Sequence, residues 1–220
     1  MEFPKCGRRS SSLSAMRFKL LIFILLLLLA SRASAVIIDG IAAIVNTDVI
    51  TKSEVYFADK LKLDISGLPA RPDVLSKRID HHLVLQQVVK QPPLAISDED
   101  VRSAVDTFAS GHGEKDDFLL YLNSIGMNYA DFEKEVREQL TIRKFIGERF
   151  RPFVNITLEQ AEKYYNDVYK PNKEKAGQQA PPFAESFTEI QNLLVEAQVQ
   201  DRIKKWLNDI RQAAVINVKE

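Results

Sequence analysis

Histidine and cysteine are the side chains that most often bind transition metals in proteins. The 220 residues include one cysteine, Cys6, and three histidines, at positions 81, 82 and 112. His81 and His82 fall inside one expected helix, where neighbouring side chains point about 100° apart, so they cannot chelate one metal together. His112 stands between two glycines, away from any further ligand. We therefore expect no metal site, and we expect no cofactor.

The first 35 residues have the pattern of a secretory signal peptide. Basic residues precede an unbroken apolar run over residues 20–30, and a small Ala-Ser-Ala site ends at Ala35. A membrane anchor is the alternative, but it would need about 20 apolar residues. We expect cleavage between Ala35 and Val36, whether Met1 or Met16 is the true start, and no stable membrane insertion afterwards.

Loss of the signal peptide makes the chain mildly acidic. Residues 1–35 hold six of the 30 basic and one of the 30 acidic residues, which leaves 24 and 29. No basic stripe with interleaved aromatic residues is present, so we expect no nucleic-acid partner. Cys6 leaves with the signal peptide, so the mature chain has no disulfide and depends on its apolar core. A chain of this size buries roughly 70% of its unfolded surface, which suffices for one core.

Both ends of the mature chain have the composition of β-strands. Residues 36–50 are rich in β-branched side chains and are interrupted by the turn signal Asn46-Thr47-Asp48, which predicts a hairpin. Residues 215–218 are a candidate strand that would leave its backbone unpaired unless it joined this hairpin. We therefore predict a mostly α (α+β) fold in which a small antiparallel β element joins the two ends.

Between these ends, apolar residues at three- to four-residue spacing predict a series of helices. Cap signals begin several of them, including the capping boxes at Thr51 and Thr157. The most amphipathic stretch, residues 129–151, needs a partner surface along most of its length, and the helices at 74–91 and 187–214 are the candidates. We expect one core domain over residues 36–220, composed of a helical part (36–170), a polar linker (171–186) and a C-terminal helix and strand (187–220).

One short helix, over residues 116–125, has more apolar surface than one core contact can cover. Residues 118–122 are apolar in five consecutive positions, which on a helix reach every side. Such a helix is either packed between two layers or leaves an apolar patch exposed that holds an apolar ligand. The candidate peptide-binding residues are this patch and the aromatic residues near the linker, namely Phe118, Leu119, Tyr121, Leu122, Met127, Tyr164, Tyr165 and Phe183.

Taken in order, these segments resemble one family. The stretch from Asp39 to Asn46, followed by Val49 to Glu54, is similar to the opening of the SurA-like periplasmic chaperones. The order of the following helices matches that family as well, and the ending from Trp206 to Ile216 resembles the piece that closes its chaperone core. The resemblance covers nearly the whole mature chain.

The resemblance also shows a departure from the family pattern. Typical members carry one or two parvulin-type prolyl isomerase domains between the tyrosine-rich helix and the last helix, an interval that here is residues 171–186. All three histidines precede that interval. The resemblance therefore implies a periplasmic holdase without an isomerase domain, which binds unfolded or nascent envelope proteins, in particular outer-membrane proteins, through apolar surface and without catalysis.

Two other functions remain as alternatives. The same core could dock to one folded envelope partner as an assembly or scaffold protein, or it could be a prolyl isomerase with an unfamiliar site. A single stoichiometric partner would indicate the first, and faster isomerisation of a proline peptide the second. The sequence leaves open the client proteins, the oligomeric state and whether a separate isomerase cooperates.

Overall fold

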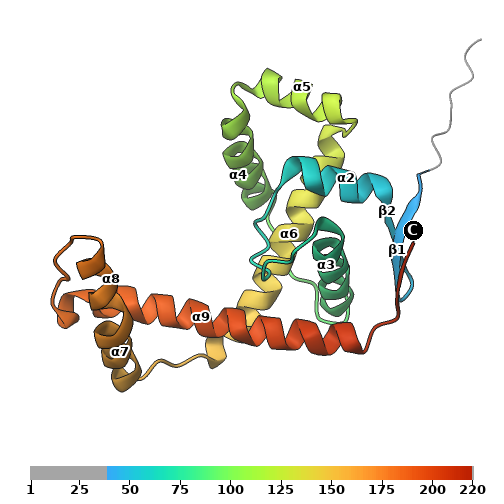
Figure 1. Cartoon of the computed structure of the whole chain (residues 1–220). Helices are drawn as coiled ribbons and strands as arrows, with labels where there is room; N and C mark the ends of the chain where they lie inside the picture. The colour runs from blue at the N-terminus through green and yellow to red at the C-terminus, as the bar shows by residue number, and fades with distance from the viewer. Residues whose placement is uncertain (1–38, 220) are drawn as a thin grey trace, which may run out of the picture. The chain divides into compact units, whose positions relative to one another are not determined.

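The computed structural model describes residues 39–219, and most of them are helical (Figure 1). Strands β1 (Ile41–Val45) and β2 (Asp48–Thr51) begin this part, and β3 (Ile216–Val218) ends it. The helices between them are α2 (Lys52–Leu61), α3 (Val74–Val88), α4 (Asp98–Ala109), α5 (Lys115–Ile125), α6 (Tyr129–Phe150), α7 (Leu158–Tyr164), α8 (Lys170–Lys175) and α9 (Phe183–Gln212). The predicted fold class is confirmed, whereas the predicted signal peptide and its cleavage site at Ala35 and Val36 lie outside the described residues.

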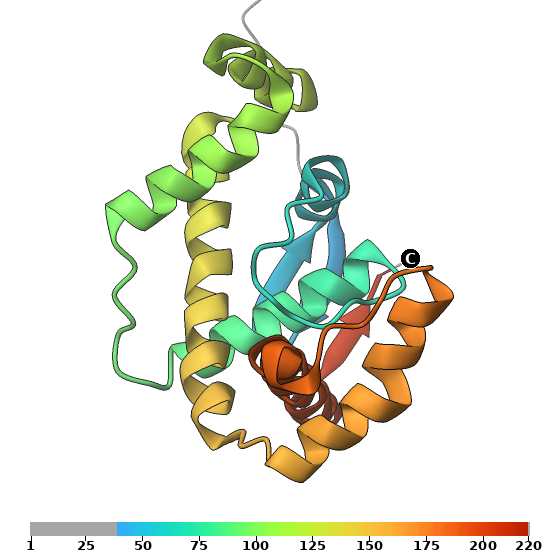
Figure 2. The same ribbon diagram turned by 90° about the vertical axis from the view of Figure 1, so that its left-hand side faces the viewer.

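The three strands form one antiparallel sheet in the order β2-β1-β3 (Figure 2). Asn46 turns β1 into β2 with a φ of 56°, a left-handed conformation in which Asn is enriched. Its backbone N–H donates to the Val215 carbonyl at 2.8 Å, and its side-chain oxygen accepts from the Val215 N–H at 3.0 Å. β3 then pairs with β1, from Ile216 opposite Val45 to Val218 opposite Ala43. This confirms the predicted pairing of the terminal strand with the hairpin.

Helix α6 contributes to two separate parts of the core. Its N-terminal half buries Phe132 and Val136 against α4 and α5. Its C-terminal half buries Ile142, Phe145 and Ile146 against α3 and α9. The two partner helices predicted for this segment, α3 and α9, are therefore confirmed, but their apolar contacts cover only its C-terminal half.

Cap hydrogen bonds form at four positions where the sequence predicts a capping residue, Thr51, Ser97, Asn128 and Thr157, with a difference in detail at Thr51. Asn128 and Ser97 accept from the backbone N–H groups of Asp131 and Asp100, and Thr157 forms the reciprocal capping box. Thr51 accepts from the Glu54 N–H, which is the first half of a box. The Glu54 carboxylate instead accepts hydrogen bonds from α3, so its side chain joins two helices where the local pattern predicted a local cap.

The tyrosine-rich helix that begins after Thr157 extends beyond Tyr169, where the sequence predicts its end. Beyond α7 the chain passes through a π-helical turn, η3 (Tyr165–Tyr169), directly into α8. Within the described residues only 176–182 connect α8 to α9, and no separate domain lies between these helices. α9 begins at Phe183, four residues before the predicted start, because the Phe183 ring packs edge-on against Tyr165, whose hydroxyl donates to the Pro181 carbonyl at 2.9 Å.

α9 makes contacts at both of its ends. Near its start Ile190 is buried with Ala161 of α7, and further along Val199, Ile203 and Leu207 are buried with residues of α3 and α6. Although α9 has 30 residues, neither it nor any other helix between residues 39 and 219 combines the length and the apolarity of a membrane-crossing segment.

Truncation of Phe132 tests the part of the core formed by α4, α5 and the N-terminal half of α6. The side chain is fully buried, with ring centroids 5.3 Å from Phe108 and 5.1 Å from Phe118. Phe132→Ala should lower the free energy of unfolding by about 3–5 kcal/mol, because it removes a large buried ring and leaves a cavity. Leu120→Ala is the control, since Leu120 is 66% exposed and its loss should change stability by no more than about 0.5 kcal/mol. Equal effects of both changes in denaturant titrations would contradict the placement of Phe132 in the core.

Candidate functional site

An apolar groove lies between α4, α6 and the segment that follows α2. Its volume is about 950 Å³, within the range of ligand-binding clefts. Its apolar lining comes from three parts of the chain and consists of Leu63, Ile65, Ile96, Ala104, Phe108 and Leu140. Asp100 and the basic residues Arg143 and Lys144 also line it, so charges of both signs are present. We call this feature the apolar groove.

Helix α4 is amphipathic in a way that serves both the core and the groove. Val101 and Val105 on one side are buried against α5 and α6. Ala104 and Phe108 are only partly buried and line the apolar groove. Phe108 also stacks on Phe132 in the core, so the wall of the groove rests directly on buried aromatic rings.

Polar contacts from α6 hold the segments on both sides of the apolar groove. The buried Gln139 side chain accepts from the Ile65 N–H at 2.9 Å and donates to the Leu63 carbonyl at 3.1 Å. On the opposite side Lys144 donates to the Ala95 carbonyl at 2.9 Å, and Arg137 to the Ile96 carbonyl at 3.2 Å. These bonds satisfy backbone groups outside regular elements and fix the position of the apolar lining relative to α6.

The five predicted binding residues on and after α5 lie outside the lining of this groove. Phe118, Leu122 and Met127 are buried core residues, so they offer no exposed surface for a peptide in this conformation. Leu119 and Tyr121 are half-buried, and the Tyr121 hydroxyl donates to the Lys60 carbonyl. Within the apolar run, Phe118 and Leu122 face the core and Leu120 is exposed, as expected for a helix that packs on one side.

The other three predicted residues form a separate aromatic cluster. Tyr164, Tyr165 and Phe183 are half-buried and pack around Tyr169 and Ile190 at the start of α9. The Tyr165 and Phe183 ring centroids are 5.5 Å apart in an edge-to-face arrangement. These contacts hold α7 and α8 on α9, and a role of the partly exposed rings in peptide binding stays a prediction.

The apolar groove is not predicted from the sequence, although some of its signal is present. The spacing of Val101, Ala104, Val105 and Phe108 predicts an apolar stripe on α4, but periodicity cannot separate the positions that reach the core from those that line an open groove. Leu63 and Ile65 lie in the irregular segment after α2, where no periodicity exists. The hydrogen bonds of Gln139 that place them span more than 70 residues of sequence.

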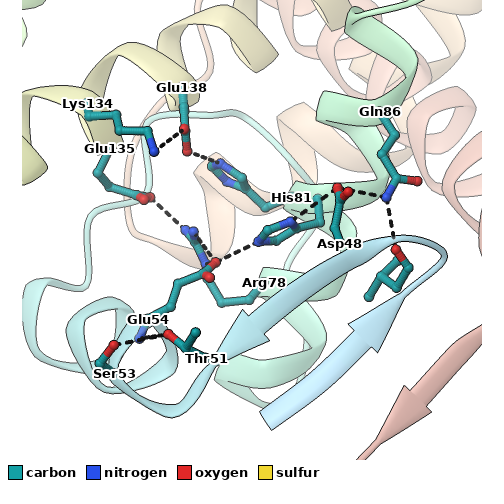
Figure 3. Close-up of polar contacts among 12 residues, drawn as sticks. Asp48, Thr51, Ser53, Glu54, Arg78, His81, Gln86, Lys134, Glu135 and Glu138 are labelled. Atoms are coloured by element: carbon teal, nitrogen blue, oxygen red, sulfur yellow. Dashed lines mark hydrogen bonds and ion pairs between the residues drawn. The ribbon is translucent and has the colours of Figure 1, made fainter. Parts of the chain in front are cut away.

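A buried polar network connects α2, α3 and α6 (Figure 3). Arg78 of α3 is its centre, because its Nε and Nη2 atoms lie 2.8 and 2.5 Å from Oε1 of Glu54, and its Nη1 atom lies 2.8 Å from Oε1 of Glu135. His82 Nε2 lies 2.7 Å from the same Glu54 oxygen. Gln139 donates to Glu135, which links the network to the wall of the apolar groove. We call these residues the Arg78 network.

The charges in this network shift one another's protonation. Burial alone would raise the pKa of Glu54, but the hydrogen bond from His82 and the positive charge of Arg78 outweigh it and lower the pKa to about 2. Burial likewise opposes ionisation of Glu135, and the charge of Arg78 lowers its pKa nonetheless. Both carboxylates are therefore ionised at neutral pH and hold Arg78 from two sides.

The two adjacent histidines point to different carboxylates, as expected for neighbours on a helix. His82 contacts Glu54, whereas His81 Nε2 lies 3.6 Å from Oε2 of Glu138 on α6. The third histidine, His112, packs its ring on Tyr121 with centroids 4.6 Å apart and lines the apolar groove. The three histidines thus have separate environments.

Comparison with known proteins places these features in a family. Residues 38–145 match the family model of the SurA N-terminal domain. This part of the chain is therefore a SurA-like N-terminal domain. The apolar groove and the Arg78 network both fall within the matched residues.

Several curated relatives carry the name Chaperone SurA. The protein from Pseudomonas aeruginosa is 26% identical over 146 residues, which are 61% of this chain and 34% of the relative. The protein from Xanthomonas campestris pv. campestris is 32% identical over 126 residues, or 53% of this chain and 27% of the relative. The protein from Pseudomonas syringae pv. syringae is 26% identical over 216 residues, which are 89% of this chain and 50% of the relative. The chain thus spans half or less of the length of these SurA relatives.

Removal of Arg78 tests the weight of the network. Arg78→Met would leave Glu54 and Glu135 facing each other without the cation, and breaking a buried ion pair in this way costs about 3–5 kcal/mol. The neighbouring Lys77→Met is the matched control, because Lys77 and Asp64 form a half-exposed pair at 3.7 Å, worth at most about 1 kcal/mol. Thermal and denaturant unfolding measure both variants. A loss of stability in Arg78→Met no greater than in Lys77→Met would contradict the structural role of the network.

Proposed function

We propose that this chain is a periplasmic chaperone of the holdase type, which binds unfolded polypeptides, outer-membrane proteins among them, in the apolar groove. The observation that carries the proposal is the apolar groove itself. It is open, has a volume of about 950 Å³ and lies within the part that matches the SurA N-terminal domain. The names of the SurA relatives support the general class. The signal peptide pattern in the sequence supports export.

The chemistry of the apolar groove suits transient binding of unfolded chains. Each Leu or Phe side chain that a client buries contributes about 1.5–3 kcal/mol. A few such anchors give weak, reversible binding once the ordering of the client is subtracted. Apolar contacts are not directional, so clients of different sequence can use the same surface. Asp100, Arg143 and Lys144 add contacts to polar groups of the client chain.

We further propose that client binding requires no catalysis. His82 is committed to the Arg78 network, and His112 packs on aromatic rings of α4 and α5. The apolar groove is lined mainly by side chains without acid, base or nucleophilic chemistry. A proline-peptide isomerisation assay separates this proposal from the enzymatic alternative, and we expect no acceleration above the uncatalysed rate.

An aggregation assay with a charge placed in the groove tests the proposal. The chain at several-fold molar excess should suppress the light scattering of a urea-denatured outer-membrane protein on dilution. Ala104→Glu should weaken suppression several-fold, because a client would have to desolvate the carboxylate. Ala130→Glu is the matched control, since Ala130 is exposed on α6 and does not line the groove.

The outcomes of this assay separate the alternatives. No suppression by the unaltered chain would contradict the holdase proposal. Suppression that Ala104→Glu and Ala130→Glu leave equally intact would place client binding elsewhere, for example at the aromatic cluster of α7 to α9. Capture of one folded partner in a fixed ratio, together with no suppression, would favour the assembly alternative.

A further inference from the structure

We propose that His81, Glu135 and Glu138 form a binding site for a divalent transition-metal ion between α3 and α6 (Figure 3). His81 comes from α3, and the two glutamates lie three residues apart on α6, which places them on one face of that helix. One ligand atom from each residue lies within 4.8 Å of the other two. An imidazole with two carboxylates is a donor set suited to ions such as Zn²⁺.

The buried His81 imidazole has a nitrogen atom that could bind a metal ion at this position. His81 is only 5% exposed, and its Nε2 atom has no hydrogen-bond partner. The nearest carboxylate oxygen, Oε2 of Glu138, lies 3.6 Å away, which is too long for a hydrogen bond. A buried nitrogen without a partner is unfavourable. A metal ion held between the histidine and the two carboxylates would supply the partner it lacks.

The surrounding charges leave room for a divalent cation. Arg78 and Gln139 both bond Oε1 of Glu135, and Lys134 lies 3.8 Å from Oε1 of Glu138, so the second oxygen of each carboxylate is available. The charge of Arg78 is offset by Glu54, and Lys134 is largely exposed to solvent. The two glutamates therefore provide two negative charges for an ion of charge +2.

The site also has access to solvent and needs only small side-chain movements. Zn²⁺ binds N and O ligands at about 2.0–2.2 Å, so ligand atoms around one ion lie about 3.4 Å apart. The donor atoms would close by roughly 1 Å, which glutamate side-chain rotations can provide. A cavity of about 370 Å³ is lined by both His81 and Glu135, and it offers an entry route and space for a water ligand. A bound ion would connect α3 to α6 beside the Arg78 network.

Isothermal titration of the purified protein with ZnCl₂, together with thermal unfolding, tests the site. We expect one saturable Zn²⁺ equivalent and a higher unfolding temperature in its presence. His81→Gln and Glu138→Gln should each weaken binding at least about tenfold and reduce the thermal shift. His112→Gln and Glu148→Gln are matched controls from outside the site and should bind Zn²⁺ as the unaltered chain does. MgCl₂ should give no saturable binding, because imidazole favours transition metals.

The opposite results would overturn the proposal. Absence of saturable Zn²⁺ binding, or equal affinity in His81→Gln, Glu138→Gln and the controls, would reduce the cluster to an ordinary contact between His81 and Glu138. Circular dichroism verifies the fold of each variant. If His81→Gln fails to fold, the partly exposed Glu138→Gln decides the question alone, since its side chain is 30% exposed and its replacement keeps the shape.

Discussion

The buried guanidinium of Arg78 is the constraint on which the arrangement of the N-terminal helices depends. It is 6% exposed, and an unpaired charge at that depth would be strongly destabilising. Glu54 and Glu135 must therefore stay beside it, which fixes the start of α2 and the middle of α6 relative to α3. A second buried charged group, the carboxylate of Asp80, extends the same principle, because Arg71 and Arg211 both pair with it and Arg211 lies on α9.

The Arg78 network and the apolar groove are directly connected. Glu135 accepts from Gln139, and Gln139 holds the backbone at Leu63 and Ile65, so the wall of the groove is positioned by the same helix face that binds Arg78. The Arg78 network pairs its charged groups with one another, whereas the apolar groove leaves apolar surface open. For the proposed holdase, a support held by these contacts would let a client bind without rearrangement of the protein itself.

Local features of this fold could be predicted from the sequence, and long-range ones could not. Caps at Asn128, Ser97 and Thr157 act within three residues, and the β3 pairing followed from the need to satisfy a lone strand. The role of Glu54 was missed because its partner Arg78 is 24 residues away and a local cap explained the same residue. Apolar spacing predicts the helices, but the choice between core and open surface depends on neighbours distant in sequence. The sequence therefore does not show that Phe118 and Leu122, predicted as binding residues, are buried in the core.

Client binding in the apolar groove is tested most directly by locating a bound client on the surface. A photo-crosslinking amino acid in place of Thr107, which lines the apolar groove, should capture an unfolded outer-membrane protein in the periplasm. The same amino acid in place of Thr188, an exposed residue on α9 outside the groove, should capture little. Preferential crosslinking from Thr107 is the predicted result. Equal crosslinking from both positions, or none from Thr107 while Thr188 captures clients, would contradict a holdase that works through the apolar groove.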